Sequence, residues 1–205
     1  MKEAVILANG TFPAHQLVLS FLEKKHFLIC CDGAVNELIR RGGVPNLIIG
    51  DLDSISEDLK EKYQDILIHN ADQSNNDLSK AVNWCVQNNF DAINIIGATG
   101  KREDHTIANI ALLTEYQKKL KVKMYTDTGF FTAITKSSKF ISYKGQQVSI
   151  FSLTPNLEIS SENLKYPLQK LKLKSWWMGT LNESLANSFS ISFEKEAAVL
   201  VYQEY

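Results

Sequence analysis

Apolar residues along the first 127 positions form short runs that alternate with segments of helical spacing. The strand-like runs are residues 4–8, 27–31, 47–49, 66–69, 93–96 and 122–125. Helical spacing follows Ala14 toward Lys25 and covers residues 34–41, 77–89 and 104–119. This alternation predicts a parallel sheet with helices on both faces, and the nearly continuous apolar runs predict strands buried on both sides.

The pattern changes after about Gly129, where long helical spacing ends and short strand-like stretches begin. These stretches are residues 130–135, 139–143, 147–153, 168–173, 189–193 and 198–202. Turn residues separate them, and residues 189–193 alternate with period two, so one face is expected to be solvated. We therefore predict an antiparallel sandwich or barrel of roughly 70 residues.

The bulk composition excludes several classes of protein. The 205 residues are 44% hydrophobic and 22% charged, which is ordinary for a globular protein. The formal net charge of −1 gives no reason to expect nucleic acid or an anionic membrane as a partner. No apolar run approaches the ~20 residues that span a bilayer. The three cysteines have no metal-ligand spacing and suit a reducing compartment, so we expect a cytoplasmic location.

Two carboxylates follow the apolar run 47–49, in the sequence Gly50-Asp51-Leu52-Asp53-Ser54. If the backbone stays extended, Asp51 and Asp53 point to the same side and repel each other unless a cation lies between them. Mg²⁺ prefers such ligands, together with phosphate oxygens. The alternative is a plain turn in which Ser54 and Glu57 form a capping box for the next helix.

Polar residues concentrate in four loops, each after a predicted strand. The loops are Asp32-Gly33-Ala34-Val35-Asn36, the Asp51/Asp53 segment, residues 71–77 and residues 97–105. In a parallel sheet all four meet at one rim. That rim would carry Asp32, Asp51, Asp53, Asp77 and Asp104 with Lys101 and Arg102. Acids for Mg²⁺ and bases for phosphate are the components of phosphoryl transfer.

Other interpretations of these loops remain open. Asp77 and Asp104 also suit helix N-termini, and the loop at 97–102 also suits an ordinary strand-to-helix turn. That loop is not a P-loop, because Ile95 and Arg102 stand where Gly and Ser/Thr are required. In the second half, Trp176 and Trp177 would face opposite sides if they lie on a strand, one toward the core and one toward a cleft or interface.

In their order along the chain, these loops resemble the thiamine pyrophosphokinase family. Residues 32–36 are similar to the family's Asp-Gly-Gly-Ala-Asn element, and residues 50–54 to its Gly-Asp-Phe-Asp-Ser element. Asp72-Gln73 with Asn76-Asp77 is similar to its Asp-Gln…Thr-Asp element, and residues 101–105 to its Gly-Arg-x-Asp-His element. Residues 164–168 are similar to the family's Leu-Lys-Tyr/Trp-Pro-Leu segment, and residues 179–183 to its Gly-Thr-Ser-Asn-Glu segment. The resemblance covers nearly the whole chain.

The resemblance implies transfer of the pyrophosphoryl group of ATP to the hydroxyl of thiamine, with Mg²⁺, giving thiamine diphosphate and AMP. It implies an α/β Rossmann-like three-layer domain at residues 1–130 for ATP and Mg²⁺. An antiparallel β-sandwich at 131–205 would bind thiamine and form a homodimer, with the thiamine site between subunits. Metal ligands would be Asp51, Asp53 and Asp77, and Arg102 and Asp104 would join them in catalysis. Substrate-binding residues would be Asp32, Asn36, Gln73, Lys80, Thr99, Lys101, Tyr166, Thr180 and Asn182.

Three positions depart from the family pattern. Gly33-Ala34-Val35 replaces Gly-Gly-Ala, and Asn76 replaces a Thr. Leu181 replaces a Ser whose hydroxyl could form a hydrogen bond with the pyrimidine of thiamine. Two other functions also fit the acidic rim. One is a metal-dependent phosphohydrolase, which the basic loop and the second domain disfavour. The other is a non-catalytic thiamine or nucleotide sensor, which retention of all the acidic residues disfavours.

Overall fold

The computed structural model describes residues 1–23, 25–72 and 74–205 and divides the chain into two compact units. The first unit comprises Met1–Ile110 and Lys119–Asp127, and the second comprises Ala111–Lys118 and Thr128–Tyr205. Within the described ranges, no helix has the length and apolar character needed to cross a membrane.

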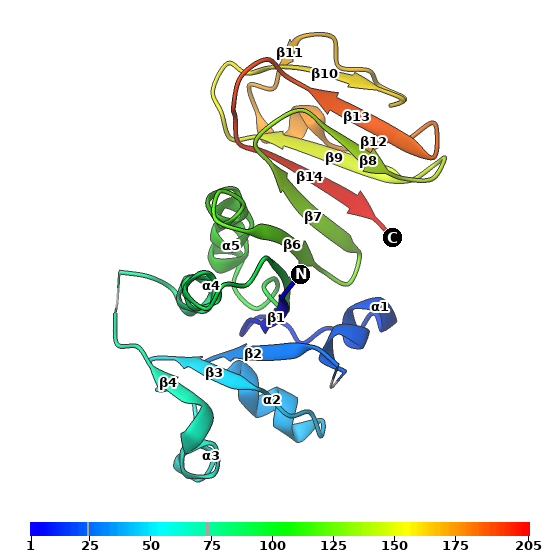
Figure 1. The fold of residues 1–205 in the computed structure, drawn as a ribbon. Coiled ribbons are helices and arrows are strands. Elements are labelled where there is room, and N and C mark those ends of the chain that lie inside the picture. The colour runs from blue at the N-terminus through cyan, green and yellow to red at the C-terminus, as the bar shows by residue number, and fades with distance from the viewer. Residues whose placement is uncertain (24, 73) are drawn as a thin grey trace. The chain divides into compact units, whose positions relative to one another are not determined.

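The first unit is built on a parallel sheet (Figure 1). Its strands are β1 (Glu3–Leu7), β2 (Phe27–Cys31), β3 (Leu47–Gly50), β4 (Leu67–His69), β5 (Ala92–Ile96) and β6 (Lys121–Tyr125). They lie in the order β6-β5-β1-β2-β3-β4, and every neighbouring pair is parallel. The strands begin and end close to the predicted apolar runs, because those runs are the segments that burial selects.

The chain order reverses at β1, which has β2 on one side and β5 on the other. The loops after β1 and β5 are joined there by main-chain bonds, from Gly10 N–H to the Gly97 oxygen and from Thr11 N–H to the Thr99 oxygen. In open α/β sheets the carboxyl ends of strands at such a reversal form the usual ligand crevice.

Helices cover both faces of this sheet. The helical segments are α1 (Gln16–Leu19), η1 (Ser20–Leu22), α2 (Ala34–Arg40), α3 (Glu57–Lys62), η2 (Gln64–Ile66), α4 (Asp77–Gln87) and α5 (Glu103–Tyr116). Figure 1 shows α2 and α4 on opposite sides of the strands. On α4, Trp84 is half-buried and stacks on Phe27 of β2 with 5.8 Å between ring centroids. The prediction of helices on both faces is confirmed.

The second unit is an antiparallel β-sandwich. Its strands are β7 (Gly129–Ile134), β8 (Ser138–Ile141), β9 (Gln147–Ser152), β10 (Glu158–Glu162), β11 (Leu171–Lys172), β12 (Asn182–Glu183), β13 (Ser188–Ser192) and β14 (Val199–Glu204). Strands β12-β9-β14-β7 form one layer and β11-β10-β13-β8 the other. Both layers contribute to one core, in which Phe189 is fully buried and stacks on Phe140. The predicted fold class, α/β followed by an antiparallel β-sandwich, is confirmed.

Two local predictions are wrong, and two short strands were missed. The helix predicted from Ala14 toward Lys25 is reduced to α1 and η1, since Val18 is the buried residue of α1 and there is little apolar face to extend it. Trp176 and Trp177 lie not on a strand but in the 3-10 helix η3 (Trp176–Gly179), where both are exposed. Strands β10 and β12 were not predicted, because one is mostly polar and the other is two residues long.

Candidate functional site

Three carboxylates meet at the ends of two neighbouring strands of the first unit. Asp32 directly follows β2, and Asp51 and Asp53 follow β3. Each offers a carboxylate oxygen, and these oxygens all lie within 4.8 Å of one another. Like charges this close repel unless a cation lies among them.

The backbone reaches this arrangement through a turn and not through an extended segment. Leu52 has a positive φ of 63°, so the expectation of an extended segment carrying Asp51 and Asp53 is wrong. The turn is closed by the Asp53 N–H, which donates to Asp51 Oδ1 at 3.4 Å. The capping box is also absent: α3 begins after Ser56, and the Ser54 hydroxyl donates to Asp53 Oδ1 instead. Asp51 and Asp53 nevertheless lie at one site, because the turn brings their carboxylates together.

Asp32 is the most buried member of this acidic cluster. Only 4% of its surface is exposed, and its Oδ1 atom is buried with no hydrogen-bond partner among the described residues. Gly50 permits this packing, since a Cβ atom there would lie 2.8 Å from Asp32 Cβ. A buried carboxylate oxygen without a donor is costly. A hard cation among the three carboxylates removes that cost, so the residues present fit Mg²⁺.

The acidic cluster opens into a cavity of about 540 Å³, which we call the acidic cavity. Asp77 and Lys80, at the start of α4, also line it. Lys80 Nζ donates to Asp77 Oδ1 at 2.9 Å, and the Lys80 side chain is 4% exposed. Burial raises the pKa of Asp77, while the bond from Lys80 opposes that shift. Asn76 caps α4 by accepting from the Ser79 N–H at 2.8 Å, so it supplies the cap that a Thr would.

The loop after β5 brings cations to the same acidic cavity. Lys101, with a positive φ of 58°, donates from Nζ to Asn9 Oδ1 at 2.9 Å. Arg102 makes a two-bond pair with Asp104, with 3.1 Å between Nε and Oδ1. The hydrogen bonds from Arg102 lower the pKa of Asp104 to about 2. Lys101 and Arg102 line the cavity together with His105.

The predicted residues of the first unit therefore gather largely at one place. The acidic cavity is lined by seven of them: Asp32, Asp51, Asp53, Asp77, Lys80, Lys101 and Arg102. Asn36 lies beside it and donates to the Ser54 main-chain oxygen at 2.8 Å. Thr99 is half-buried and accepts from the Thr11 N–H through its main chain. The predicted substrate-binding residue Gln73 lies outside the described residues.

The predicted residues of the second unit form their own group. Both side-chain atoms of Asn182 bond to the main chain of Tyr166, with Oδ1 accepting at 3.0 Å and Nδ2 donating at 2.7 Å. Asn182 is buried by this contact, whereas Tyr166 is 60% exposed. The Thr180 hydroxyl donates to the Trp177 oxygen at 2.7 Å. Leu181 has a positive φ and is 78% exposed, and Trp177 is 74% exposed.

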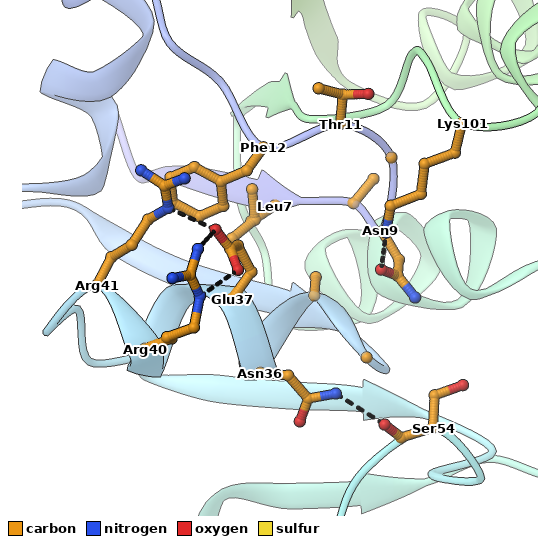
Figure 2. Close-up of a pocket in the computed structure, with 14 residues that line it drawn as sticks. Leu7, Asn9, Thr11, Phe12, Asn36, Glu37, Arg40, Arg41, Ser54 and Lys101 are labelled. Carbon is orange, nitrogen blue, oxygen red and sulfur yellow. Dashed lines mark hydrogen bonds and ion pairs between the residues drawn. The ribbon is translucent and has the colours of Figure 1, made fainter.

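A second cavity of about 590 Å³ adjoins the acidic cavity (Figure 2). The two share Ala8, Asn9, Gly10, Ser54 and Lys101. Sequence reasoning missed Asn9 and four other lining residues, Phe12, Glu37, Arg40 and Arg41. The one available signal was the Asn9-Gly10 turn directly after the first strand, where a parallel sheet places its ligands.

Comparisons with known proteins agree with this architecture. Residues 18–125 match the family model of the thiamin pyrophosphokinase catalytic domain, and residues 129–202 match that of its substrate-binding domain. A thiamin pyrophosphokinase from Caenorhabditis elegans is 27% identical over 202 residues, with 88% of this chain and 83% of the relative covered. A thiamine pyrophosphokinase from Bacillus subtilis is 23% identical over 219 residues, with 98% of each chain covered.

The crystal structure of a thiamine pyrophosphokinase from Bacillus subtilis has the same fold. It superposes with a TM-score of 0.83 at 22% identity and covers 99% of both chains. The matched domains define a two-domain kinase, with a catalytic α/β part and a substrate-binding sandwich. The chain belongs to the thiamin pyrophosphokinase family, and the resemblance read from its motifs is confirmed. The phosphohydrolase and sensor alternatives find no support in these comparisons.

Proposed function

We propose that this protein transfers the pyrophosphoryl group of ATP to the hydroxyl of thiamine and releases AMP. Family membership supports the reaction class. The single observation that carries the proposal for these residues is the acidic cavity, in which three close carboxylates face a basic loop. Phosphoryl transfer needs little covalent chemistry from the protein, and depends on positioning and charge neutralisation.

We assign Asp32, Asp51 and Asp53 as ligands of Mg²⁺, because their oxygens already converge. This adds Asp32 to the ligands expected from sequence and leaves Asp77, which lines the same cavity, as a further candidate. Mg²⁺ bound there would neutralise charge on the phosphate oxygens and orient them.

The basic residues then act on the phosphates. Lys101 and Arg102 line the acidic cavity and would bind the phosphate oxygens as the thiamine hydroxyl attacks the β-phosphorus and AMP leaves. Asp104 would hold the Arg102 guanidinium in place through its paired bonds. Arg102 lines the acidic cavity and Asp104 pairs with it from outside the described lining, so we assign Asp104 to position Arg102. Lys80 would keep the Asp77 carboxylate in place in the same way.

In this proposal the second unit binds thiamine. Tyr166 and Thr180 would lie near the pyrimidine, and Asn182 would hold the Tyr166 segment, since its amide is bonded to that main chain. Leu181 offers an apolar contact where the family pattern has a hydroxyl.

We also propose a homodimer that shares its thiamine sites. Trp176, Trp177 and Leu181 are exposed by 51%, 74% and 78%, which is a large apolar surface for one small unit. Light scattering should give about twice the chain mass of 23.1 kDa, and a monomer mass would reject the shared site. The buried, unpaired Cys30, Cys31 and Cys85 suit a cytoplasmic location.

Incubation of the pure protein with ATP, Mg²⁺ and thiamine tests the function directly. We expect thiamine diphosphate and AMP in equal amounts, and neither product when thiamine is omitted. ATP hydrolysis that proceeds equally well without thiamine would instead indicate a phosphohydrolase.

A further inference from the structure

The cavity beside the acidic cavity is lined by four segments of the chain. These are the end of β1 with the loop that follows it, α2 with the residues on either side of it, and two single residues at the rim, Ser54 after β3 and Lys101 after β5. Figure 2 shows Asn9, Lys101 and Ser54 toward one end, and Phe12, Arg40 and Arg41 toward the other. Because the two cavities share their rim, one extended ligand can occupy both. We call this second cavity the Phe12–Arg41 cavity.

The single carboxylate of the Phe12–Arg41 cavity is already paired with the two guanidiniums, and the cavity keeps a net positive charge. Glu37 is the one carboxylate among its described lining residues, and it accepts from Arg40 Nε at 2.8 Å and from Arg41 Nε at 2.6 Å. These hydrogen bonds lower the pKa of Glu37 to about 2. A carboxylate held by two guanidiniums is not available to a metal ion. The metal, with the phosphates that it binds, therefore belongs in the acidic cavity, where three carboxylates converge, and the remainder of the ligand is left for this cavity.

The far end of the cavity offers flat surfaces. The Arg41 guanidinium carbon lies 4.6 Å from the centroid of the Phe12 ring. Glu37 holds the guanidinium in that position from the side, as Figure 2 shows. Heteroaromatic bases stack on Phe rings and on Arg guanidinium planes. This pair suits a nucleobase in a way that a lysine or an aliphatic side chain would not.

The part of the cavity nearer the shared rim offers a hydrogen-bond donor and an acceptor. Asn9 Oδ1 accepts from Lys101, which leaves the amide nitrogen of Asn9 as a donor. Asn36 Nδ2 donates to the Ser54 oxygen, which leaves the amide oxygen of Asn36 as an acceptor. Sugar hydroxyls both donate and accept, so the two amides suit a ribose between a base and a phosphate chain.

We propose that the Phe12–Arg41 cavity binds the nucleoside end of the nucleotide donor, with Arg41 as the residue that contacts the base. The proposal rests on the proposed function, because it takes the donor to be ATP. It adds a base-contacting residue, Arg41, that lies outside the four polar loops at the strand ends.

Steady-state kinetics on variants at this site test the proposal. Arg41→Ala and Phe12→Ala should each raise the KM for ATP by about 10-fold, the lower part of the range for loss of base stacking. Arg41→Lys, which keeps the charge but not the plane, should show most of the Arg41→Ala effect. The KM for thiamine should change by less than about 2-fold. Lys60→Ala is the control, since Lys60 pairs with Glu57 on α3 and lines neither cavity.

A phosphate-only probe separates the two cavities. Inorganic tripolyphosphate with Mg²⁺ should inhibit competitively with ATP, and its inhibition constant should not change in Arg41→Ala, since this probe lacks a base. A parallel rise in that constant would show that Arg41 binds phosphates and would overturn the proposal. A rise in the KM for thiamine instead would assign the cavity to the acceptor, and would overturn it as well.

Calorimetric titration with AMP gives a readout that does not need turnover. AMP should bind the parent chain and bind Arg41→Ala about 10-fold more weakly, and circular dichroism should show that the fold is kept. Equal AMP affinity in the two would reject the nucleoside site even if thiamine diphosphate is made. Loss of AMP affinity in Arg41→Ala without any thiamine diphosphate synthesis by the parent would reject the proposed function and keep the site.

Discussion

The ammonium group of Lys101 lies 2.9 Å from the side-chain oxygen of Asn9, a residue 92 positions earlier in the chain. The two residues stand on the loops after β5 and β1, where the chain order of the parallel sheet reverses. Both residues line both cavities. Because the partner of Lys101 is a neutral amide, the bond fixes the position of the ammonium without cancelling its charge. A fixed cation at the shared rim suits phosphates that pass from one cavity to the other.

Lys101→Met is therefore expected to weaken binding of every ligand that carries the phosphates. The KM for ATP and the inhibition constant of Mg²⁺-tripolyphosphate should both rise by about 10-fold, since a charge-assisted hydrogen bond contributes about 1.5–3 kcal/mol. Lys118→Met is the matched control, because Lys118 is an exposed lysine paired with Glu115. A rise for ATP alone would mean that Lys101 acts on the nucleoside and not on the phosphates.

Asp53→Asn is expected to lower turnover by at least ~10²-fold, the scale for loss of one preorganised charge stabiliser. Asp53 is exposed, so the free energy of unfolding should change by less than about 0.5 kcal/mol. Kinetics at increasing Mg²⁺ and chemical denaturation measure the two quantities. Near-normal turnover at saturating Mg²⁺ would remove Asp53 from the metal site.

Asp32→Asn is expected to separate stability from activity. Its buried Oδ1 has no donor among the described residues, and one of its carboxylate oxygens lies within 4.8 Å of oxygens of Asp51 and Asp53. An amide in its place can donate to those carboxylates, so the metal-free variant should gain about 1–2 kcal/mol in free energy of unfolding.

Turnover of Asp32→Asn should fall by at least ~10²-fold. Added Mg²⁺ should raise the melting temperature of the parent and not that of the variant, because ligand binding stabilises the fold that binds it. Equal stabilisation of both proteins by Mg²⁺ would show that Asp32 is not a ligand.

Glu37 predicts a pH dependence of stability. Hydrogen bonds from Arg40 and Arg41 lower its folded pKa from an ordinary 4.5 to about 2. The folded state thus binds this proton less readily, and the ionised pair stabilises the fold above pH 4.5 and loses that effect as the pH falls toward 2. Glu37→Gln should be less stable than the parent at pH 7, and the difference should vanish in acid. Urea denaturation across this range measures it, and a difference that does not depend on pH would contradict the assignment.

Gly50→Ala is expected to disturb the site through packing alone. The added Cβ would lie 2.8 Å from Asp32 Cβ and 3.2 Å from Asp32 Cα, so β3 or the Asp32 turn must move. Overpacking of this kind costs about 1–3 kcal/mol, which denaturation would detect. Unchanged stability together with unchanged Mg²⁺ affinity would show that this contact relaxes freely.

Much of the fold could be predicted because burial in a parallel sheet selects continuous apolar runs. The run at residues 27–31 coincides with β2 (Phe27–Cys31), and the run at 47–49 differs from β3 (Leu47–Gly50) by one residue. Polar or very short strands carry no such signal. In β10 (Glu158–Glu162), for example, Ile159 is the one fully buried residue, so period-two alternation was too weak to detect.

The candidate site was predictable in composition but not in geometry. The strand ends located Asp32, Asp51 and Asp53, but the left-handed turn at Leu52 depends on tertiary packing and has no marker in a non-glycine residue. The unpartnered oxygen of Asp32 is likewise a property of packing. The Phe12–Arg41 cavity escaped prediction because its walls come from separate segments that meet only in the fold.

In the proposed reaction the β- and γ-phosphoryl groups of ATP move together to thiamine. ATP labelled with radioactive phosphorus in either the β or the γ position, supplied with Mg²⁺ and thiamine, tests this most directly. Both labels should appear in the thiamine product in equal yield, and the nucleotide product should be unlabelled AMP. Transfer of the γ label alone, with the β label left in ADP, or release of labelled phosphate without thiamine, would contradict the account.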